Sequence, residues 1–430
     1  MKPVARALLV VACLGAVACD QDLPKATEIT DMRLLGAVVE VVGDPTRATP
    51  RPGEKVDVRF VAVHPTLAET NAQAQTMLLS CTQPTRYTGG VPVCQEFLRA
   101  RQGAKDLSNE LMGMQIPTKG SCSEELLKEG LKDGLYYGTM ALRCIDGDPA
   151  ARLRVSRAFS GAQMLYRGVV CERGDASIDL EDPLLFGCLG NDGETTRVHG
   201  TVTIQHDAKD ENHNPNLSGA RFFLGTPASE DGGEVDGKRR TTTGAAWPLV
   251  ADEDLPAEDA CLGSVPKCDA DAEDQTGVLC QYAYGRYRIT VQYDPTLREK
   301  LDGEYEDLEF SVFATAGELD RRFVVFESDM KPIPVSRPIA CRDDADCAGH
   351  TGAYCRALNC VEDVKAANPR TGKTETKQHR VSERADVLQG AVDWTVPDEL
   401  RGRSQLVRFF FTALDRRGGF AVTSRALCLN

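Results

Sequence analysis

The sequence lacks the short motifs of the common hydrolases and nucleotide-binding enzymes. It contains no Gly-x-Ser-x-Gly, no His-Glu-x-x-His and no Gly-x-x-x-x-Gly-Lys, which mark a serine nucleophile, a zinc-binding helix and a phosphate-binding loop. No Cys-x-x-Cys pair occurs, and the six histidines are scattered, so a zinc site is not indicated. We therefore expect a protein that is not an enzyme and that binds no cofactor.

Aromatic residues are few, and the chain has no net positive charge. Two tryptophans and an aromatic content of 6% leave little material for an exposed platform on which sugar rings could stack. The formal net charge is −14, so the chain would be repelled by the phosphates of a nucleic acid. No nucleic-acid partner is expected.

Beyond residue 18 the sequence contains no apolar run that approaches the roughly 20 residues needed to span a bilayer. The first residues have a basic start, an apolar stretch at 7–17 and a small-residue site before Cys19, which is the pattern of a secretory signal. Cys19 resembles the lipid-modified cysteine of bacterial lipoproteins. We expect residues 1–18 to be a lipoprotein signal peptide and 19–28 an anchor segment. An ordinary secretory peptide is the alternative.

This interpretation predicts a location. The protein would be exported and anchored to the bacterial cell envelope through the lipid on Cys19. Because retention signals next to the cysteine differ between lineages, the outer and the inner membrane both stay open, as does the leaflet.

Cysteine is abundant, with 16 residues in the chain. Cys13 leaves with the signal peptide and Cys19 takes the lipid, so an even set is left. An even number of cysteines in an exported protein indicates disulfides. The candidates are Cys81, Cys94, Cys122, Cys144, Cys171, Cys188, Cys261, Cys268, Cys280, Cys341, Cys347, Cys355, Cys360 and Cys428.

Alternation of apolar and polar residues predicts antiparallel strands along much of the chain. The predicted strands cover residues 32–42, 55–62, 76–81, 152–155, 163–171, 197–205, 221–225, 286–293, 308–314, 388–396 and 406–429. The alternation at 55–62 predicts one buried and one solvent-facing side. The last stretch predicts a hairpin that turns at 416–419, where two glycines allow positive φ.

Residues 95–140 depart from this pattern, because their apolar residues recur at helical spacing. Ser121 and Glu124 form a capping-box pair in front of one such run. We predict a helical insertion, which either covers a sheet edge or provides a binding surface.

A second departure is the cysteine-rich segment 341–360. So short a segment cannot bury a core, so crosslinks must stabilise it. Its four cysteines allow three pairings, between which the sequence does not decide. The polar residues 361–383 that follow are predicted to be a loop.

Residues 208–219 are polar and turn-forming, and they predict a linker between two domains, 29–207 and 220–430. Asp207, Asp210, Asn212 and Asn214 resemble the acidic joints between cadherin domains, in which oxygen ligands bind calcium and stiffen the linker. Because this stretch offers about half of the six to eight oxygens that calcium needs, a solvated linker without metal is the alternative.

Four stretches together carry a resemblance. They are GDPTRATPRPGEKVDVRF at 43–60, NHNPNL at 212–217, FATAGELD at 313–320 and DRRGG at 415–419. The chain resembles bacterial lipoproteins built from immunoglobulin-like modules. The resemblance implies a mainly β fold with two tandem immunoglobulin-like β-sandwich domains, a helical insertion in the first and a small cysteine-rich insertion in the second. Antibody topology is not implied, since the Cys…Trp…Cys spacing is missing.

The expected function is that of a non-catalytic, lipid-anchored cell-envelope protein with a binding or structural role. Its partners would be the membrane, through lipidated Cys19, and a protein or polysaccharide of unknown identity. One alternative is a calcium-stiffened adhesion protein. Another is a carbohydrate-active or carbohydrate-binding protein, because the two carboxylates of a glycosidase cannot be recognised from their spacing in sequence.

Overall fold

The fold is mostly β. The computed structural model describes residues 27–30, 32–63, 75–80, 86–88, 91–93, 118–121, 141–145, 148–155, 157, 159–171, 175–178, 186–189, 195–225, 247–248, 278–279, 285–339, 344–356, 359–367, 374–396 and 405–429. In this part of the chain the helical elements are short 3₁₀ turns, namely η3 (Ala208–Asp210), η4 (Leu217–Gly219), η6 (Pro295–Leu297) and η7 (Asp344–Cys347). The prediction of a mainly β protein is confirmed. Among the described residues, no helix has the length and apolar character to cross a membrane.

Two antiparallel sheets from the first half of the chain pack face to face as a sandwich. Sheet I has the strand order β1-β2-β8-β7, and sheet II has the order β12-β9-β3-β6. Their strands are β1 (Arg33–Val41), β2 (Lys55–Val63), β3 (Gln75–Ser80), β6 (Thr118–Ser121), β7 (Ala141–Ile145), β8 (Asp148–Arg154), β9 (Gln163–Cys171) and β12 (Thr195–Thr203). Val58, Phe60, Leu153, Tyr166 and Val202 belong to the core between them. We call these two sheets the N-terminal sheet pair.

Two further sheets form the C-terminal sheet pair. Sheet III has the order β15-β28-β27-β19-β21, and sheet IV has the order β14-β13-β16-β26-β20, with β22 also paired to β26. Their strands are β13 (Ala220–Gly225), β14 (Trp247–Pro248), β15 (Val278–Leu279), β16 (Gly285–Tyr293), β19 (Leu308–Ala314), β20 (Glu318–Leu319), β21 (Phe323–Phe326), β22 (Ile333–Pro338), β26 (Ser382–Val396), β27 (Gln405–Asp415) and β28 (Phe420–Leu429). The core is rich in aromatic rings, among them Tyr293, Phe310, Phe326, Trp394 and Phe409.

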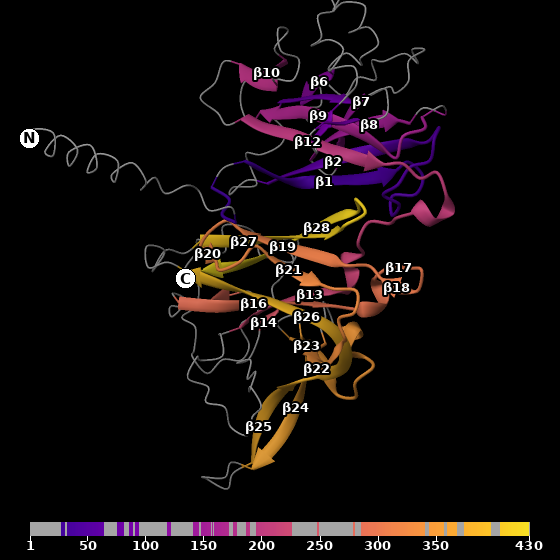
Figure 1. Cartoon of the computed structure of the whole chain (residues 1–430). Helices are drawn as coiled ribbons and strands as arrows, with labels where there is room; N and C mark the ends of the chain where they lie inside the picture. Colours follow the sequence, from indigo (N-terminus) through magenta and orange to yellow (C-terminus); the bar gives the residue numbers. More distant parts are fainter. Residues whose placement is uncertain are drawn as a thin grey trace, which may run out of the picture.

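Three smaller ladders and one longer projection complete the fold. The ladders are β4 (Arg86–Thr88) with β5 (Val91–Val93), β10 (Asp175–Ile178) with β11 (Phe186–Leu189), and β17 (Lys300–Leu301) with β18 (Glu304–Tyr305). The projection consists of β23 (Ala353–Arg356), β24 (Asn359–Ala367) and β25 (Thr374–Arg380), and Figure 1 shows it extending away from the sheets. We call it the arm.

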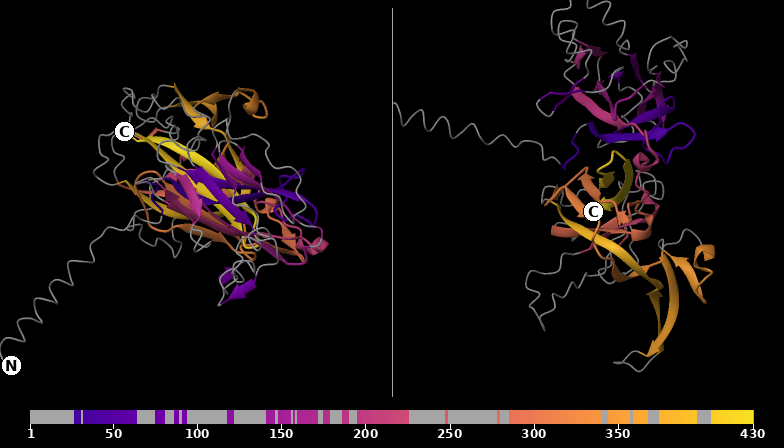
Figure 2. Two further views of the ribbon diagram at one scale, coloured as in Figure 1. Left: turned by 90° about the horizontal axis from the view of Figure 1, so that it is seen from above. Right: turned by 45° about the vertical axis from the view of Figure 1, so that its right-hand side comes forward.

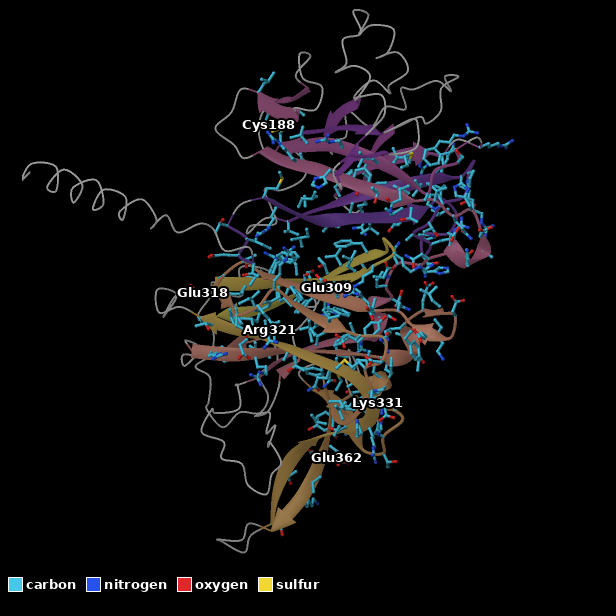
Figure 3. All side chains as sticks on the ribbon, viewed as in Figure 1. Cys188, Glu309, Glu318, Arg321, Lys331 and Glu362 are labelled. Carbon is cyan, nitrogen blue, oxygen red and sulfur yellow. A yellow bond between two sulfur atoms is a disulfide. The ribbon has the colours of Figure 1, made fainter. Side chains whose placement is uncertain are left out.

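The four large sheets are stacked in the order II, I, III, IV, as Figure 1 and the right-hand view of Figure 2 show. Sheets I and III meet through an apolar cluster that includes Val38, Val61, Phe313, Phe410 and Phe420, and Figure 3 shows side chains filling the spaces between the layers. The predicted solvent-facing side of residues 55–62 is therefore wrong. Strand β2 lies in an inner layer and is buried on both faces, which its own alternation could not reveal.

The predicted closing hairpin is confirmed. Strands β27 and β28 pair antiparallel from Gln405–Leu429 to Leu414–Phe420. The backbone N–H of Asp415 donates to the carbonyl of Gly419, and Gly418 has a φ of 104°. A glycine is needed at Gly418 because side chains disfavour that conformation.

Two predicted segments differ from the structure. Within the predicted helical insertion 95–140, residues 118–121 form β6, which pairs with β3; the rest of the insertion lies outside the described residues. The predicted loop 361–383 is wrong, since most of it forms the β24–β25 ladder of the arm and the start of β26. Residues such as Glu362 and Lys365 on this ladder are exposed, so no apolar alternation marks it.

Two disulfides have both of their cysteines among the described residues. Cys171–Cys188 joins β9 to β11, and Cys347–Cys360 joins η7 to β24, which selects one bridge within the cysteine-rich segment. Cys355 is also disulfide-bonded. Strand β7 contains Cys144, and β28 contains Cys428. The remaining candidates lie outside the described residues, as does the predicted lipidation site; they are Cys19, Cys81, Cys94, Cys122, Cys261, Cys268, Cys280 and Cys341.

Candidate functional site

The predicted linker is built into the contact between the two sheet pairs. Asn212 is fully buried. Its carbonyl accepts from the N–H of Ala48 at 2.8 Å, and its N–H donates to Thr49 Oγ1 at 2.9 Å. Its side-chain Nδ2 donates to Asp415 Oδ2 at 2.8 Å. One residue thus connects the loop after β1 with the β27–β28 hairpin. We call the segment 205–216 and the side chains that it contacts the joint.

Asn214 makes a second connection in the joint. Its Nδ2 donates to the carbonyl of Val39 on β1 at 2.8 Å, and its Oδ1 accepts from the N–H of Phe420 on β28 at 3.0 Å. An amide side chain donates through its nitrogen and accepts through its oxygen without carrying a charge. Asn214 therefore holds sheet I and sheet III in one register.

Asp415 is the buried acceptor at the centre of the joint. Its Oδ1 accepts from the backbone N–H groups of Arg417 at 2.8 Å and Gly419 at 2.7 Å, and Oδ2 takes the bond from Asn212. Burial raises the pKa of this carboxyl, although these three hydrogen bonds act in the other direction. A side chain at Gly419 would place its Cβ 2.7 Å from the carbonyl of His213, so the close approach of hairpin and linker requires glycine.

Charged side chains surround this centre. Arg417 Nη1 donates to Glu299 Oε2 at 3.1 Å, and Nη2 donates to the carbonyl of Glu211. His213 Nδ1 also contacts Glu299 through Oε1. The guanidinium of Arg417 therefore supplies the positive charge between the linker and the C-terminal sheet pair.

Glu306 is a further acid beside the joint. Its side chain is nearly buried. Oε1 accepts from the N–H of Glu299 at 3.1 Å, and Oε2 is buried without a hydrogen-bond partner among the described residues. Burial raises the pKa of Glu306 to about 7, and the charges of Asp415 and Glu299 act in the same direction, whereas the hydrogen bond from the Glu299 N–H and the charge of Arg417 oppose this rise. This acid therefore changes charge near neutral pH.

The four calcium candidates do not converge on one point. Asp207 and Asp210 bond each other across η3, where the N–H of Asp207 donates to Asp210 Oδ2 at 3.0 Å. Asn214 Oδ1 accepts from the N–H of Phe420, whereas Asn212 Oδ1 is buried without a hydrogen-bond partner among the described residues. Among the described residues, no group of three or more His, Cys, Asp or Glu side chains is arranged to hold a metal ion. A calcium site at the joint is therefore not supported by the positions of these side chains.

The residues that the C-terminal sheet pair contributes to the joint are not predicted from the sequence. Asp415, Arg417, Glu299 and Glu306 were not predicted, because their partners are 86 or more residues away in several of the contacts. One local signal was available. An Asp side chain that accepts a hydrogen bond from the backbone N–H two residues later forms a local turn. Asp415 and Arg417 have this spacing.

The joint can hold two layers in place, and its described donors and acceptors are mostly used to bond one another. No family model matches the chain.

Proposed function

We propose that this chain is an exported lipoprotein, anchored to the cell envelope through Cys19, with a non-catalytic binding or structural role. Its two immunoglobulin-like domains would comprise residues 29–207 and 220–430, separated by 208–219. The secretory pattern before Cys19, the presence of disulfides and the β-sandwich sheets support this proposal, because disulfides persist in oxidising, extracytoplasmic compartments.

The contact between sheets I and III is the main support for a structural role. Sheets I and III bury an apolar cluster between them, and the hydrogen bonds of Asn212 and Asn214 cross the same boundary. Such a contact leaves no free hinge between the two sheet pairs. We infer a rigid platform that holds the arm in a fixed position relative to residues 27–29, where the chain enters the fold, and that needs no calcium for its stiffness.

The anchor is tested by mass spectrometry of the N-terminal peptide from the membrane fraction. We expect a peptide that begins at Cys19 and carries acyl chains, and we expect Cys19→Ala to shift the protein out of the detergent phase. An unmodified Cys19 would exclude the anchor. Protease shaving of intact cells would then decide whether the chain faces the outside.

The binding role is tested at the arm. A photocrosslinking amino acid at Glu362, which Figure 3 labels on the arm, should form adducts with a protein or polysaccharide in intact envelopes. The same group at Asp302, in the turn between β17 and β18, is the matched exposed control. Adducts at Glu362 but not at Asp302 support presentation of the arm, whereas equal labelling contradicts it.

A further inference from the structure

The place where the chain enters the fold is fixed. The N–H of Ile29 donates to the carbonyl of Ala314 at 2.9 Å, and the N–H of Ala314 donates to the carbonyl of Thr27 at 3.0 Å. These bonds attach the start of the described chain to the end of β19, and Ile29 is buried there. Seven residues lie between Cys19 and Thr27, so the two are eight residue steps apart. A chain spans at most about 3.3–3.6 Å per residue, so the entry lies within about 30 Å of a lipid on Cys19.

Two arginines lie beside this entry. The guanidinium carbon of Arg33 is 5.5 Å from the centroid of the Phe313 ring, and that of Arg322 is 5.3 Å from the same centroid. Arg33 Nη1 also donates to the carbonyl of Glu28 at 3.0 Å. The Phe313 ring therefore holds the positive charges of Arg33 and Arg322 close together, beside the point where the chain enters the fold.

The charges of these two arginines are not neutralised by the fold. Among the described residues, no carboxylate forms an ion pair with Arg33 or Arg322. Burial and then the charge of Arg322 lower the pKa of Arg33, as expected for neighbouring cations. The chain has 64 acidic and 50 basic residues, so this pair of neighbouring cations is an exception to its overall negative charge.

Two residues next to Arg322 in sequence are also exposed. Arg321 is 61% exposed, and its contact with Asp320 is long, at 3.5 Å. Phe323 is 49% exposed. Arg321 belongs with sheet IV, because the Oδ1 of its partner Asp320 accepts from the N–H of Asp393 on β26, whereas Phe323 pairs with Ser311 on β19, the strand of Phe313. We call Arg33, Arg322 and Phe323 the entry patch. Guanidinium groups match the geometry of phosphate oxygens, and an exposed aromatic ring suits the boundary between headgroups and acyl chains.

We propose that the entry patch binds the anionic phospholipid headgroups of the membrane that carries the lipid anchor, and so determines which side of the protein faces that membrane. This inference rests on the proposed anchor at Cys19. The acidic remainder of the chain is repelled by the same headgroups, which leaves one preferred orientation. Glu28, Glu318 and Asp320 are close by in sequence and reduce the attraction, so the patch acts on a chain that is already tethered, where the effective concentration is high.

The test uses the mature chain with Cys19→Ser, so that binding does not depend on the lipid. Its sedimentation is measured with vesicles of phosphatidylcholine and with vesicles of equal parts phosphatidylcholine and phosphatidylglycerol. We expect binding to the anionic vesicles only, weakened by salt. Each arginine near an anionic surface contributes about 1 kcal/mol, so Arg33→Gln with Arg322→Gln should lower the partition coefficient about 30-fold.

The matched control removes the same charge elsewhere. Arg154→Gln with Arg157→Gln acts at the other end of sheet I, since Arg154 pairs with Lys55 while Arg33 pairs with Val63. This variant should bind like the parent. The pair Arg33→Lys with Arg322→Lys keeps the charges and should retain most of the binding, which separates loss of charge from loss of folding.

Three outcomes would overturn the proposal. They are no binding of the parent to anionic vesicles, equal loss in the control variant, and displacement by inorganic phosphate at constant ionic strength, which would indicate a site for a free anion. Failure of the anchor is recognised independently, from the mass of the N-terminal peptide.

Discussion

At the scale of single residues, the joint depends on side chains that have no substitute. Asn212 donates into Asp415 from a fully buried position. Asn212→Asp would replace this donor by a second carboxylate at the same distance, so two acceptors would face each other without a proton between them. We expect a loss of about 3 kcal/mol in the free energy of unfolding, measured by urea denaturation at neutral pH.

Asn216→Ala is the control for this variant. Asn216 lies in the same segment, but it is exposed and caps η4 through the N–H of Ser218 at 3.0 Å. Its loss should cost only about 1 kcal/mol. Equal effects of the two substitutions would contradict a special role for the bond between Asn212 and Asp415.

Glu306 makes the stability of the protein depend on pH. Burial raises its pKa from 4.5 to about 7 in the folded state, so the folded state binds more protons than the unfolded state between these two values. The free energy of unfolding then falls as the pH rises through this window. We expect the Tm to be higher at pH 6 than at pH 8 by about 2–4 °C.

Glu306→Gln is the test of that assignment. The amide keeps the shape of the protonated acid and cannot ionise, so the Tm of this variant should be nearly constant between the two pH values. A variant that keeps the pH dependence of the parent would show that other groups cause it.

At the scale of elements, the sequence predicts strands well where one face is buried and the next element is near. The β27–β28 hairpin combines strong alternation with glycines at its turn, and both features are local. Strand β2 shows the limit. Its second face is covered by residues such as Phe410 and Phe420, which lie more than 340 positions away, and no local pattern encodes that contact.

The arm shows a second limit. Strands β24 and β25 pair over Val361–Arg380 to Ala367–Thr374, yet polar side chains on exposed strands give no apolar period to detect. The joint has the same character, because polar residues in a turn-forming segment resemble a solvated linker. Burial of Asn212 is decided by the neighbouring sheets, which the segment itself does not reveal.

The base of the arm is stabilised by a crosslink. Cys347 and Cys360 are buried with a few partly buried neighbours, among them Ile339 and Val381, and the loop that they close spans 13 positions. A disulfide of this loop size contributes about 3 kcal/mol. Cys347→Ser with Cys360→Ser should make the arm sensitive to limited proteolysis while the main unfolding transition keeps its Tm, since the large core between sheets III and IV is separate.

The second disulfide provides the comparison. Cys171→Ser with Cys188→Ser removes a bridge from the N-terminal sheet pair, so it should leave the arm resistant to protease. Cleavage of the arm in both variants would mean that the Cys347–Cys360 bridge has no local role.

At the scale of the whole molecule, the stack of four sheets replaces the string of modules that a flexible linker would allow. A cadherin-like joint stiffens only when calcium is bound, whereas here the sheets themselves meet. We expect the Tm to be the same with added calcium and with a chelator, measured by calorimetry. A rise in Tm with calcium would restore the calcium-stiffened adhesion protein, with Asp207, Asp210, Asn212 and Asn214 as the residues to substitute.

Cooperativity follows from the same stack. Because sheets I and III share an apolar cluster, unfolding of one sheet pair would expose the cluster on the other, so we expect a single calorimetric transition. Phe420 is central to this coupling, since its ring packs so closely on Gly36 that a Cβ there would lie 2.5 Å from Cζ. Phe420→Ser should cost about 3–5 kcal/mol and split the transition in two.

Phe323→Ser is the matched control, because that ring is largely exposed and lies on edge strand β21 of the same sheet. It should leave one transition with nearly the parent Tm. If Phe420→Ser lowered the Tm but kept a single transition, the rest of the apolar cluster together with the hydrogen bonds of Asn212 and Asn214 would be enough to couple the sheet pairs. If the parent itself melted in two steps, the platform would be two independent domains, and the fixed position of the arm relative to the N-terminal sheet pair would have no physical basis.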